Sequence, residues 1–254
     1  GMDLARSPGA LLVRRIRERP ELAERSVDLL VRAMKLAADR LVHTPLAIPY
    51  QMQLTLTAIA LHEVPDGGSI DDEWLRRWWG LTTVWGSFAS SATHRVQAAL
   101  RHLRAGLLGR REPWPKLLFH STESSPLPNL ELRNARARYF ADGYANQCGH
   151  LDLLHSRGNR AVVSLIRGEG TRPGNRFIWE VERAEQLLGY LDDQNLEPLR
   201  DHFVDAECLE AWARGDYQGF LVAREAIMNR FELTWFEGLH AKEFIDGSQR
   251  NPLQ

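Results

Sequence analysis

One periodic pattern near the start of the chain constrains its fold more than any other feature. Six apolar residues recur at steps of 4, 3, 4, 3 and 4, which places them on one continuous stripe of an α-helix, of the kind that faces a core. Pro20 suits the first turn of this helix, whereas Pro45 and Pro49 cannot continue it. The sequence therefore predicts a helix from about residue 20 to 42, whose stripe consists of Ala23, Val27, Leu30, Met34, Ala37 and Leu41.

Helical spacing of apolar residues extends over most of the remaining chain. A helix is predicted from about residue 69, followed by a bend near Gly80 and Gly86. Residues 160–166 are predicted as either a buried strand or a helical turn, and residues 177–191 as a strand followed by a helix. The other predicted helices cover residues 8–19, 50–63, 91–108, 132–147 and 150–156, with two more within 206–245 that are joined at Gly215-Asp216.

These elements predict the fold class. We expect a mainly α, multi-helix globular bundle with a long Pro-rich loop and little or no β structure. The expected organisation is an N-terminal helical subdomain over residues 1–110, the Pro-rich loop over 111–130 and a C-terminal helical subdomain over 131–254. One continuous domain is the alternative.

Aromatic residues and one histidine give specific expectations about the core. Trp74, Trp78 and Trp79 lie near one face of a predicted helix, and core packing is the favoured interpretation because each ring buries a large area. A platform on which nucleic-acid bases stack is the alternative. In the helix predicted over 91–108, Leu103 is expected to face inward and His102 to lie outside or at the edge.

Composition excludes several classes of protein. The chain has 254 residues, 44% hydrophobic and 26% charged, so it can bury a core and is not disordered as a whole. Its two cysteines, Cys148 and Cys208, cannot form a disulfide scaffold. No apolar run approaches 18 residues and no secretory leader is recognisable, so we expect no membrane partner and a cytoplasmic location.

The charges are balanced in number but unevenly distributed. Eleven basic and three acidic residues lie between Arg76 and Arg138, a net charge of +8. Eleven acidic and three basic residues lie between Phe177 and Asp216, a net charge of −8. Two interpretations stay open: the segments are solvated faces that pair with each other, or the basic segment binds phosphate groups, including those of nucleic acid, and the acidic segment flanks it.

Three arginine-bearing segments carry the phosphate-binding hypothesis. Residues 90–95 lie at a predicted helix start, where hydroxyls and free backbone N–H groups can hold a phosphate. Residues 132–138 and the loop 171–176 present guanidinium groups, which donate paired hydrogen bonds to phosphate or to the chain's own carboxylates. The candidate phosphate-binding residues are Arg76, Arg77, Ser91, Thr93, Arg95, Arg101, Arg104, Arg133, Asn134, Arg136, Asn175 and Arg176.

Motifs of well-known catalytic and metal-binding chemistry do not occur. The sequence has no P-loop, no dinucleotide-binding glycine motif, no H-E-x-x-H, no G-x-S-x-G and no pair of C-x-x-C. His150 and His155 are five residues apart, the wrong spacing for one helical face, so a zinc site made by Cys148 with these histidines is only weakly indicated. We predict a buried thiol, surface imidazoles, no metal and no cofactor.

Five segments look familiar when taken in order. They are I-P-Y-Q-M-Q-L at 48–54, R-W-W-G through R-V-Q at 77–97, L-E-L-R-N-A-R-A at 130–137, G-N-R at 174–176 and G-D-Y-Q-G-F-L-V-A-R at 215–224. Together they resemble the GmrSD-type restriction endonuclease family, in the helical region that follows its catalytic N-terminal half. The resemblance runs from about residue 20 to 236.

The catalytic motifs of that family are missing from this chain. Neither the D-G-Q-Q-R motif of its ParB- and sulfiredoxin-like nucleotide-dependent domain nor its H-N-H nuclease motif occurs here, so no catalytic residue carries over. The resemblance implies a helical accessory module of a bacterial DNA-restriction or phage-defence protein, non-catalytic by itself, which contacts DNA phosphates or a D-G-Q-Q-R catalytic domain in cis or in trans.

Two other functions stay open. One is an enzyme for a small substrate, with an inter-helix pocket lined by Trp79, Trp85, His94 and Arg95. The other is a purely structural or oligomerising helical protein.

Overall fold

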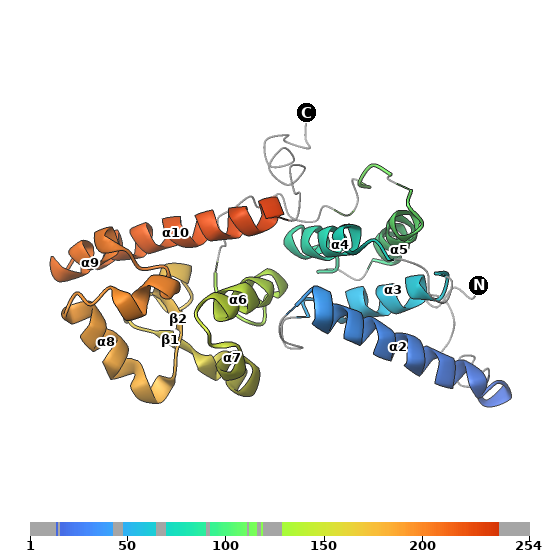
Figure 1. Ribbon diagram of the computed structural model, residues 1–254, viewed down its shortest axis with the longest axis horizontal. Coiled ribbons are helices and arrows are strands. Elements are labelled where there is room, and N and C mark those ends of the chain that lie inside the picture. The colour runs from blue at the N-terminus through green and yellow to red at the C-terminus, as the bar shows by residue number, and fades with distance from the viewer. Residues whose placement is uncertain are drawn as a thin grey trace.

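The computed structural model describes residues 14, 16–42, 48–64, 70–89, 92–110, 112–115, 118 and 129–238. The fold is mainly α, as predicted, and Figure 1 shows the helices in order along the chain. From residue 21 onward, the described α-helices are α2 (Glu21–Arg40), α3 (Gln51–Leu61), α4 (Asp72–Val84), α5 (Thr93–Leu107), α6 (Ala135–Gln147), α7 (Leu151–Arg157), α8 (Ala184–Asp192), α9 (Ala206–Ala213) and α10 (Tyr217–Gly238).

Short elements fill the connections in the C-terminal half. Strand β1 (Val162–Ser164) pairs antiparallel with β2 (Arg176–Ile178), with Val162 opposite Ile178. A strand is therefore the correct alternative within 160–166, and the strand-then-helix prediction for 177–191 is confirmed by β2 and α8. The 3-10 helices are η3 (Gly158–Ala161), η4 (Pro173–Asn175), η5 (Val181–Arg183) and η6 (Glu197–His202).

Two predicted segments lie largely outside the described residues. Of the helix predicted over 8–19, residues 14 and 16–18 are helical. Of the loop predicted over 111–130, the structure describes 112–115, 118 and 129–130. Leu118 is fully buried and its backbone carbonyl accepts a hydrogen bond from Ser87, so this part of the segment packs on the N-terminal helices.

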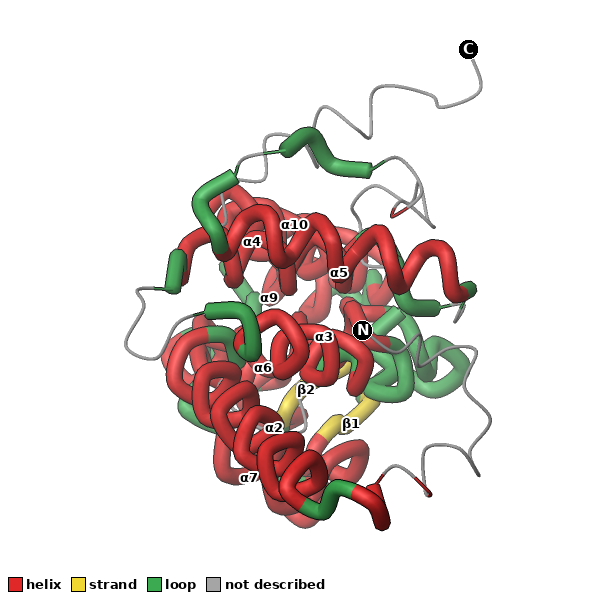
Figure 2. The backbone as a smooth tube through the Cα atoms, turned by 90° about the vertical axis from the view of Figure 1, so that its right-hand side faces the viewer, coloured by secondary structure: helices red, strands yellow, loops and turns green. Residues whose placement is uncertain are grey.

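The helices form two groups along the long axis of the molecule. Helices α2 to α5 lie at one end, and α6 to α10 with the small sheet lie at the other (Figure 1), whereas Figure 2 looks along this axis from the end that carries α2 to α5. Contacts between α4 and α6 join the groups. Their apolar clusters are largely separate, although a small one joins Val42 to Tyr139. The division into subdomains at 111–130 remains a prediction.

The core of the N-terminal group is built around the tryptophans of α4. Trp78 and Trp79 are fully buried and Trp74 is 3% exposed, so core packing is the correct interpretation of this aromatic cluster. Gln53 of α3 is also fully buried, and its amide nitrogen donates to the Trp79 carbonyl at 2.9 Å and to Thr82 Oγ1 at 2.8 Å. These bonds satisfy a polar side chain inside the core and tie α3 to α4.

The apolar stripe of α2 is not buried as the periodicity predicts. Ala37 and Leu41 lie in the core, but Val27, Leu30 and Met34 are exposed by 57%, 37% and 49% of their surface. The helix packs on α3 through a neighbouring face, on which Ala33 is fully buried. Small residues at 33 and 37 let α3 approach on that face, and this leaves most of the predicted stripe on the surface.

His102 of α5 is a second departure. Expected at the outside or edge, it is 1% exposed and lies against the rings of Trp74 and Trp114, at centroid distances of 4.9 and 4.2 Å. Its Nε2 lies 3.1 Å from the backbone carbonyl of Glu112, so that nitrogen donates. Burial lowers the pKa of His102, because the charged imidazolium would lose its hydration among these rings.

Helix α10 lies at the centre of the C-terminal group. It packs on α9 and on η4. Phe220 and Leu221 are fully buried in one apolar cluster and Met228 is 2% exposed in a second, while Ile227 packs against both. The boundary between α9 and α10 at residues 214–216 agrees with the predicted helix stop and Asp216 cap.

No helix within the described ranges has both the length and the apolar character needed to cross a membrane.

Candidate functional site

The candidate arginines of α4 and α5 are partly engaged within the chain. Arg76 Nε donates to the Arg40 carbonyl at 3.0 Å. Arg104 forms an ion pair with Glu63 at 2.9 Å. Arg77 and Arg95 are half-buried and also have partners. In contrast, Thr93 and Arg101 are exposed, whereas Ser91 lies outside the described residues.

The candidates before and within α6 serve the fold. Asn134 caps the helix, because its side-chain oxygen accepts from the backbone N–H of Arg136 at 2.9 Å. Arg133 is exposed and forms an ion pair with Glu131. Arg136 is buried, and its guanidinium donates to both carboxylate oxygens of Glu232 at 2.8 and 2.9 Å. Glu232 therefore accepts the two parallel N–H donors that the phosphate hypothesis assigned to an external ligand.

The loop candidates are also bonded internally. Asn175 is fully buried, and its oxygen accepts from the backbone N–H groups of Leu165 and Ile166 at 3.0 and 2.8 Å. Its amide nitrogen donates to the carbonyls of Ile166 and Glu169. Arg176 donates to Ser164 Oγ, at 3.0 Å. Because Arg136 and Asn175 are buried, the described candidates do not all lie on one surface, whereas Arg76, Thr93, Arg101 and Arg133 are exposed.

The residues expected to line a small-substrate pocket differ in burial. Trp79 is fully buried and its Nε1 donates to Thr57 Oγ1 at 3.1 Å, and Trp85 is 3% exposed. His94 lies exposed in the first turn of α5. The two tryptophans belong to the core, while His94 belongs to the surface.

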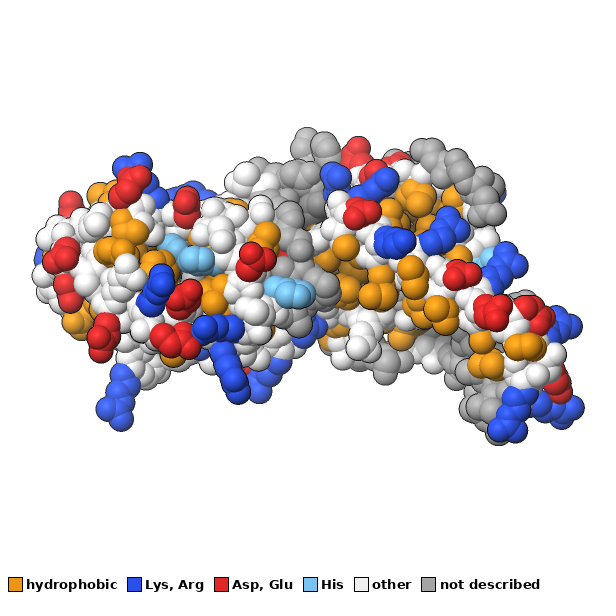
Figure 3. Space-filling view, turned by 60° about the horizontal axis from the view of Figure 1, so that its bottom comes forward, with side chains coloured by type: hydrophobic (Ala, Val, Ile, Leu, Met, Phe, Trp, Pro, Cys, Tyr) orange, Lys and Arg blue, Asp and Glu red, His pale blue; other side chains and the backbone are white. Residues whose placement is uncertain are grey.

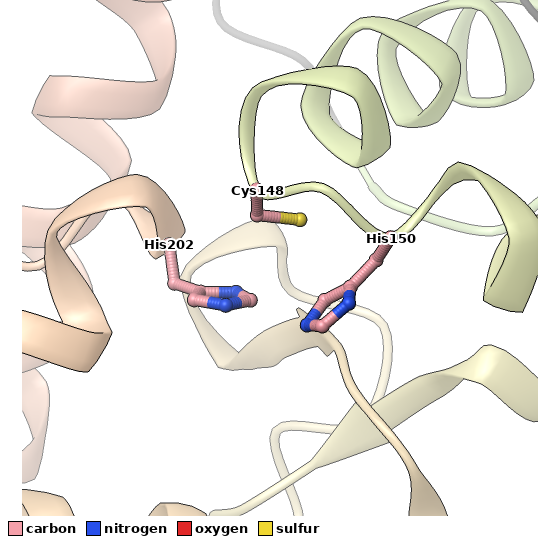
Figure 4. A group of neighbouring side chains, drawn as sticks. All are labelled: Cys148, His150 and His202. Atoms are coloured by element: carbon pink, nitrogen blue, oxygen red, sulfur yellow. The ribbon is translucent and has the colours of Figure 1, made fainter.

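A different group of side chains does converge. Cys148, His150 and His202 each offer one ligand atom, and these atoms lie within 4.8 Å of one another. Figure 4 shows Cys148 and His150 reaching in from the corner between α6 and α7, with His202 opposite them at the end of η6. The sequence suggested His155 as the partner of Cys148 and His150, but the structure brings in His202 instead.

The corner between α6 and α7 places two of the three side chains. Gly149 has φ +70°, a left-handed conformation that glycine adopts without strain. The His150 N–H bonds back to the Ala145 carbonyl at 2.8 Å, which makes the turn a Schellman cap. Because one left-handed residue ends α6 and leads directly into α7, the side chains on either side of it, Cys148 and His150, face the same space.

His202 is placed by the buried polar groups around it. Its Nδ1 lies 2.9 Å from the Tyr144 hydroxyl, and its backbone carbonyl accepts from Arg224 Nε at 2.9 Å. Arg224 Nη2 also donates to the Tyr144 hydroxyl, at 3.1 Å. Phe203, which follows, adopts a left-handed φ of +62°, so the chain turns sharply at the end of η6.

The protonation states of the cluster follow from burial. Desolvation, together with the charge of Arg224 and the neighbouring His150, lowers the pKa of His202 to about 3, so this imidazole is neutral. Desolvation also lowers the pKa of His150. It raises the pKa of Cys148 to about 12, which leaves a thiol in the absence of a cation.

Arg224 ends the motif at 215–224, but its structural role is not predicted by the sequence. It is fully buried on α10, and its guanidinium donates to the carbonyls of His202, Gly174 and Arg176 as well as to Tyr144. Its Cζ lies 3.6 Å over the Phe177 ring. An arginine within a predicted helix gives no sign that its partners are carbonyls of η4, β2 and η6 and a hydroxyl of α6.

His202 was likewise missed, and the local sequence offers little signal for it. It lies 52 residues after His150, in an acidic segment that indicates a solvated face. Its proximity to Cys148 arises from the packing of η6 on α6 and α10, which no spacing rule in the sequence describes.

The described residues form a mainly α protein with a small antiparallel sheet and a partly buried Cys–His–His cluster. Comparison of the chain with protein-family models, with curated proteins and with solved structures gave no match. The resemblance to the GmrSD-type family therefore stays a prediction.

Proposed function

We propose that this chain is a helical interaction module, non-catalytic by itself, of a bacterial DNA-restriction or phage-defence system. The observation that supports this proposal best is the exposed apolar face of α2, formed by Val27, Leu30, Val31 and Met34, which we call the α2 stripe. Figure 3 shows hydrophobic side chains gathered on the surface of the half that contains α2 to α5. Contiguous apolar surface of this kind is typical of protein contact sites.

The partner that we propose is a catalytic domain of the D-G-Q-Q-R type, in cis or in trans. The family resemblance supplies this class of partner. The residues assigned to DNA contact are mainly occupied, with Arg136 held by Glu232 and Asn175 by backbone groups, whereas the α2 stripe is left accessible by the helices around it. Docking a helix into an apolar groove uses residues spaced by three and four, as these are.

The test is a pair of charge substitutions on the stripe. Val27→Glu combined with Met34→Glu places two carboxylates where the partner would exclude water, so affinity for a purified D-G-Q-Q-R domain from the same genome should fall at least about 100-fold. Both side chains are about half exposed, so the fold should be retained, as circular dichroism can check. Val222→Glu is the matched control, because this valine is 58% exposed on α10.

Two results would contradict the docking proposal. One is unchanged affinity in the double variant. The other is a concentration-dependent dimer of the chain alone, seen by light scattering and abolished by the same substitutions, which would assign the stripe to a second copy of this chain.

Contact with DNA phosphates is a second candidate function. It is favoured by one specific observation: Arg101 projects from α5 as an exposed side chain, and no carboxylate in the described part of the chain forms an ion pair with it. Such a cation is available to a polyanion without breaking an internal bond.

A further inference from the structure

We propose that Cys148, His150 and His202 bind a single zinc ion. The three side chains come from the C-cap of α6, the N-cap of α7 and the last residue of η6, so three separate elements aim ligand atoms at one point (Figure 4). Thiolate sulfur and imidazole nitrogen are the ligands that zinc prefers in proteins. An oxygen-seeking cation such as magnesium or calcium would not select this set.

The three ligand atoms lie slightly farther apart than they would around a zinc ion, so a small movement of the side chains is enough to bind one. The atoms lie within 4.8 Å of one another. Zinc bonds of about 2.0 Å to nitrogen and 2.3 Å to sulfur in a tetrahedron put neighbouring ligand atoms roughly 3.3–3.6 Å apart. Cys148 and His150 are half-buried, so rotation of their side chains can bring them toward the more rigidly held His202.

Each of the three residues has an atom that is free to coordinate a metal ion. In the described part of the chain, the hydrogen bond of His202 uses Nδ1, which leaves Nε2 for a metal, and neither ring nitrogen of His150 takes part in a hydrogen bond. Cys148 Sγ makes one long contact, 3.8 Å from the Ala145 carbonyl. Ring nitrogens and a thiol that make no strong hydrogen bond within the chain can serve as metal ligands.

Tyr144 can hold His202 in the tautomer that binds a metal. The Tyr144 oxygen accepts a hydrogen bond from Arg224 Nη2 at 3.1 Å and lies 2.9 Å from His202 Nδ1. When His202 Nδ1 donates its N–H to this oxygen, Nε2 carries no proton and presents its lone pair to the ion. A ligating histidine whose other nitrogen donates to a fixed oxygen is the usual outer arrangement of such sites.

The charges around the cluster are compatible with a bound dication. Arg224 is the cation whose charge acts on both Cys148 and His202. Two negative charges also act on the cluster, Glu180 on His150 and Asp201 on Cys148. Zinc binding converts the Cys148 thiol to a thiolate and releases its proton to solvent, so the new positive charge is offset by one thiolate and two nearby carboxylates.

The half-buried edge of the cluster leaves room for solvent on the ion. Three protein ligands occupy three corners of a tetrahedron, and a water molecule completes it from the side of Cys148 and His150. The site is therefore of the open type, in which the fourth ligand can exchange. It lies in the C-terminal half, well separated in sequence from the α2 stripe, and does not depend on the proposed docking function.

The experiment uses the full chain after chelation and dialysis. Zinc titration followed by calorimetry against a competing chelator should give one equivalent per chain. Cobalt should replace zinc and give an absorption band of thiolate-to-cobalt charge transfer, together with the visible bands of a tetrahedral ion. These bands report the ligand type directly, which a change in stability alone would not.

Matched variants identify the ligands. Cys148→Ser and His150→Ala should each weaken zinc binding at least about tenfold, and Cys148→Ser should abolish the charge-transfer band. Cys208→Ser and His155→Ala change the other cysteine and a nearby histidine of α7, and should leave both readouts as in the unmodified chain. His150 and Cys148 are half-buried, so their variants are expected to fold; circular dichroism of each checks this.

Three outcomes would overturn the proposal. The first is a chain that binds less than one equivalent of zinc in competition with a weak chelator. The second is a cobalt complex without a thiolate band. The third is a folded Cys148→Ser variant that binds zinc as tightly as Cys208→Ser does.

Discussion

At the scale of single residues, the most consequential side chain is a buried cation that donates to no carboxylate within the described ranges. Arg224 is fully buried, yet its N–H groups donate to the carbonyl oxygens of Pro173, Gly174, Arg176 and His202 and to the Tyr144 hydroxyl. Burial lowers its pKa, but these oxygens together stabilise the charged form. The guanidinium therefore connects α10 to η4, β2, η6 and α6 through hydrogen bonds.

Replacing Arg224 by lysine tests this role. An ammonium group cannot reach several carbonyls in different directions, and each buried acceptor that loses its donor costs about 1–3 kcal/mol. We expect Arg224→Lys to lower the free energy of unfolding in urea by at least about 3 kcal/mol.

Arg230→Lys is the matched control, because Arg230 lies exposed on the same helix. Its effect should stay within about 0.5 kcal/mol. Equal stabilities of the two variants would show that the hydrogen bonds of Arg224 contribute little.

Residue types alone did not reveal which arginines and asparagines are structural. The guanidinium of Arg136 and the amide of Asn175 can hydrogen-bond a phosphate. The same groups bond equally well to Glu232 and to backbone groups, which are the partners that they have in the structure. The choice between an internal and an external partner depends on which segments pack together, and this information is spread over the whole chain.

At the scale of elements, the packing of α4 on α5 depends on one glycine. A Cβ atom on Gly106 would lie 1.7 Å from Trp74 Nε1, so the indole ring occupies the space of the missing side chain. Trp74 is itself 3% exposed and stacks on Trp114 at a centroid distance of 5.6 Å. The ring cannot move aside without disturbing the core.

We therefore expect Gly106→Ala to destabilise the protein by about 1–3 kcal/mol, through overpacking. Gly189 of α8 gives the opposite control, since a Cβ there meets nothing within 4 Å. Gly189→Ala should stabilise the protein by about 0.5–1 kcal/mol, because alanine is the better helix former. Thermal or urea unfolding measures both, and two changes of the same sign would contradict this account of the Gly106–Trp74 contact.

Helical periodicity predicted where the elements lie better than which way they face. The α2, α3, α5 and α10 helices fall close to their predicted ranges. The prediction of which face of α2 is buried was wrong, because Ala33 and Ala37 permit a closer approach to α3 than the larger residues of the stripe do. His102 was placed outside by its polarity, although one hydrogen bond to Glu112 and two aromatic neighbours suffice to bury it.

At the scale of the whole molecule, net charge was a poor guide to accessible charge. The segment from Arg76 to Arg138 carries a net +8, but Glu63, Glu131 and Glu232 take up Arg104, Arg133 and Arg136. Two of these carboxylates lie outside that segment and also outside the acidic segment 177–216. Counting charges along the sequence could not identify these pairs, because two of the three join residues more than 40 positions apart.

This distribution predicts weak binding to duplex DNA. If Arg101 is a phosphate contact, fluorescence anisotropy at low salt should show binding that weakens as salt rises. Arg101→Ala should reduce the slope of log affinity against log salt by about 0.9, the contribution of one phosphate contact. Glu207→Gln, at an exposed residue of α9, is the control and should leave the slope unchanged. Absence of binding at low salt would exclude the DNA function.

The position of α10 has a consequence for how the chain is made. This helix carries Arg224, which fastens η4, η6 and α6, and Glu225 and Glu232, which hold Arg172 and Arg136. During synthesis, the helices from α2 to α5 emerge from the ribosome first and can assemble on their own apolar cluster. The segments from α6 onward must wait, with their polar groups hydrated, until α10 has left the exit tunnel.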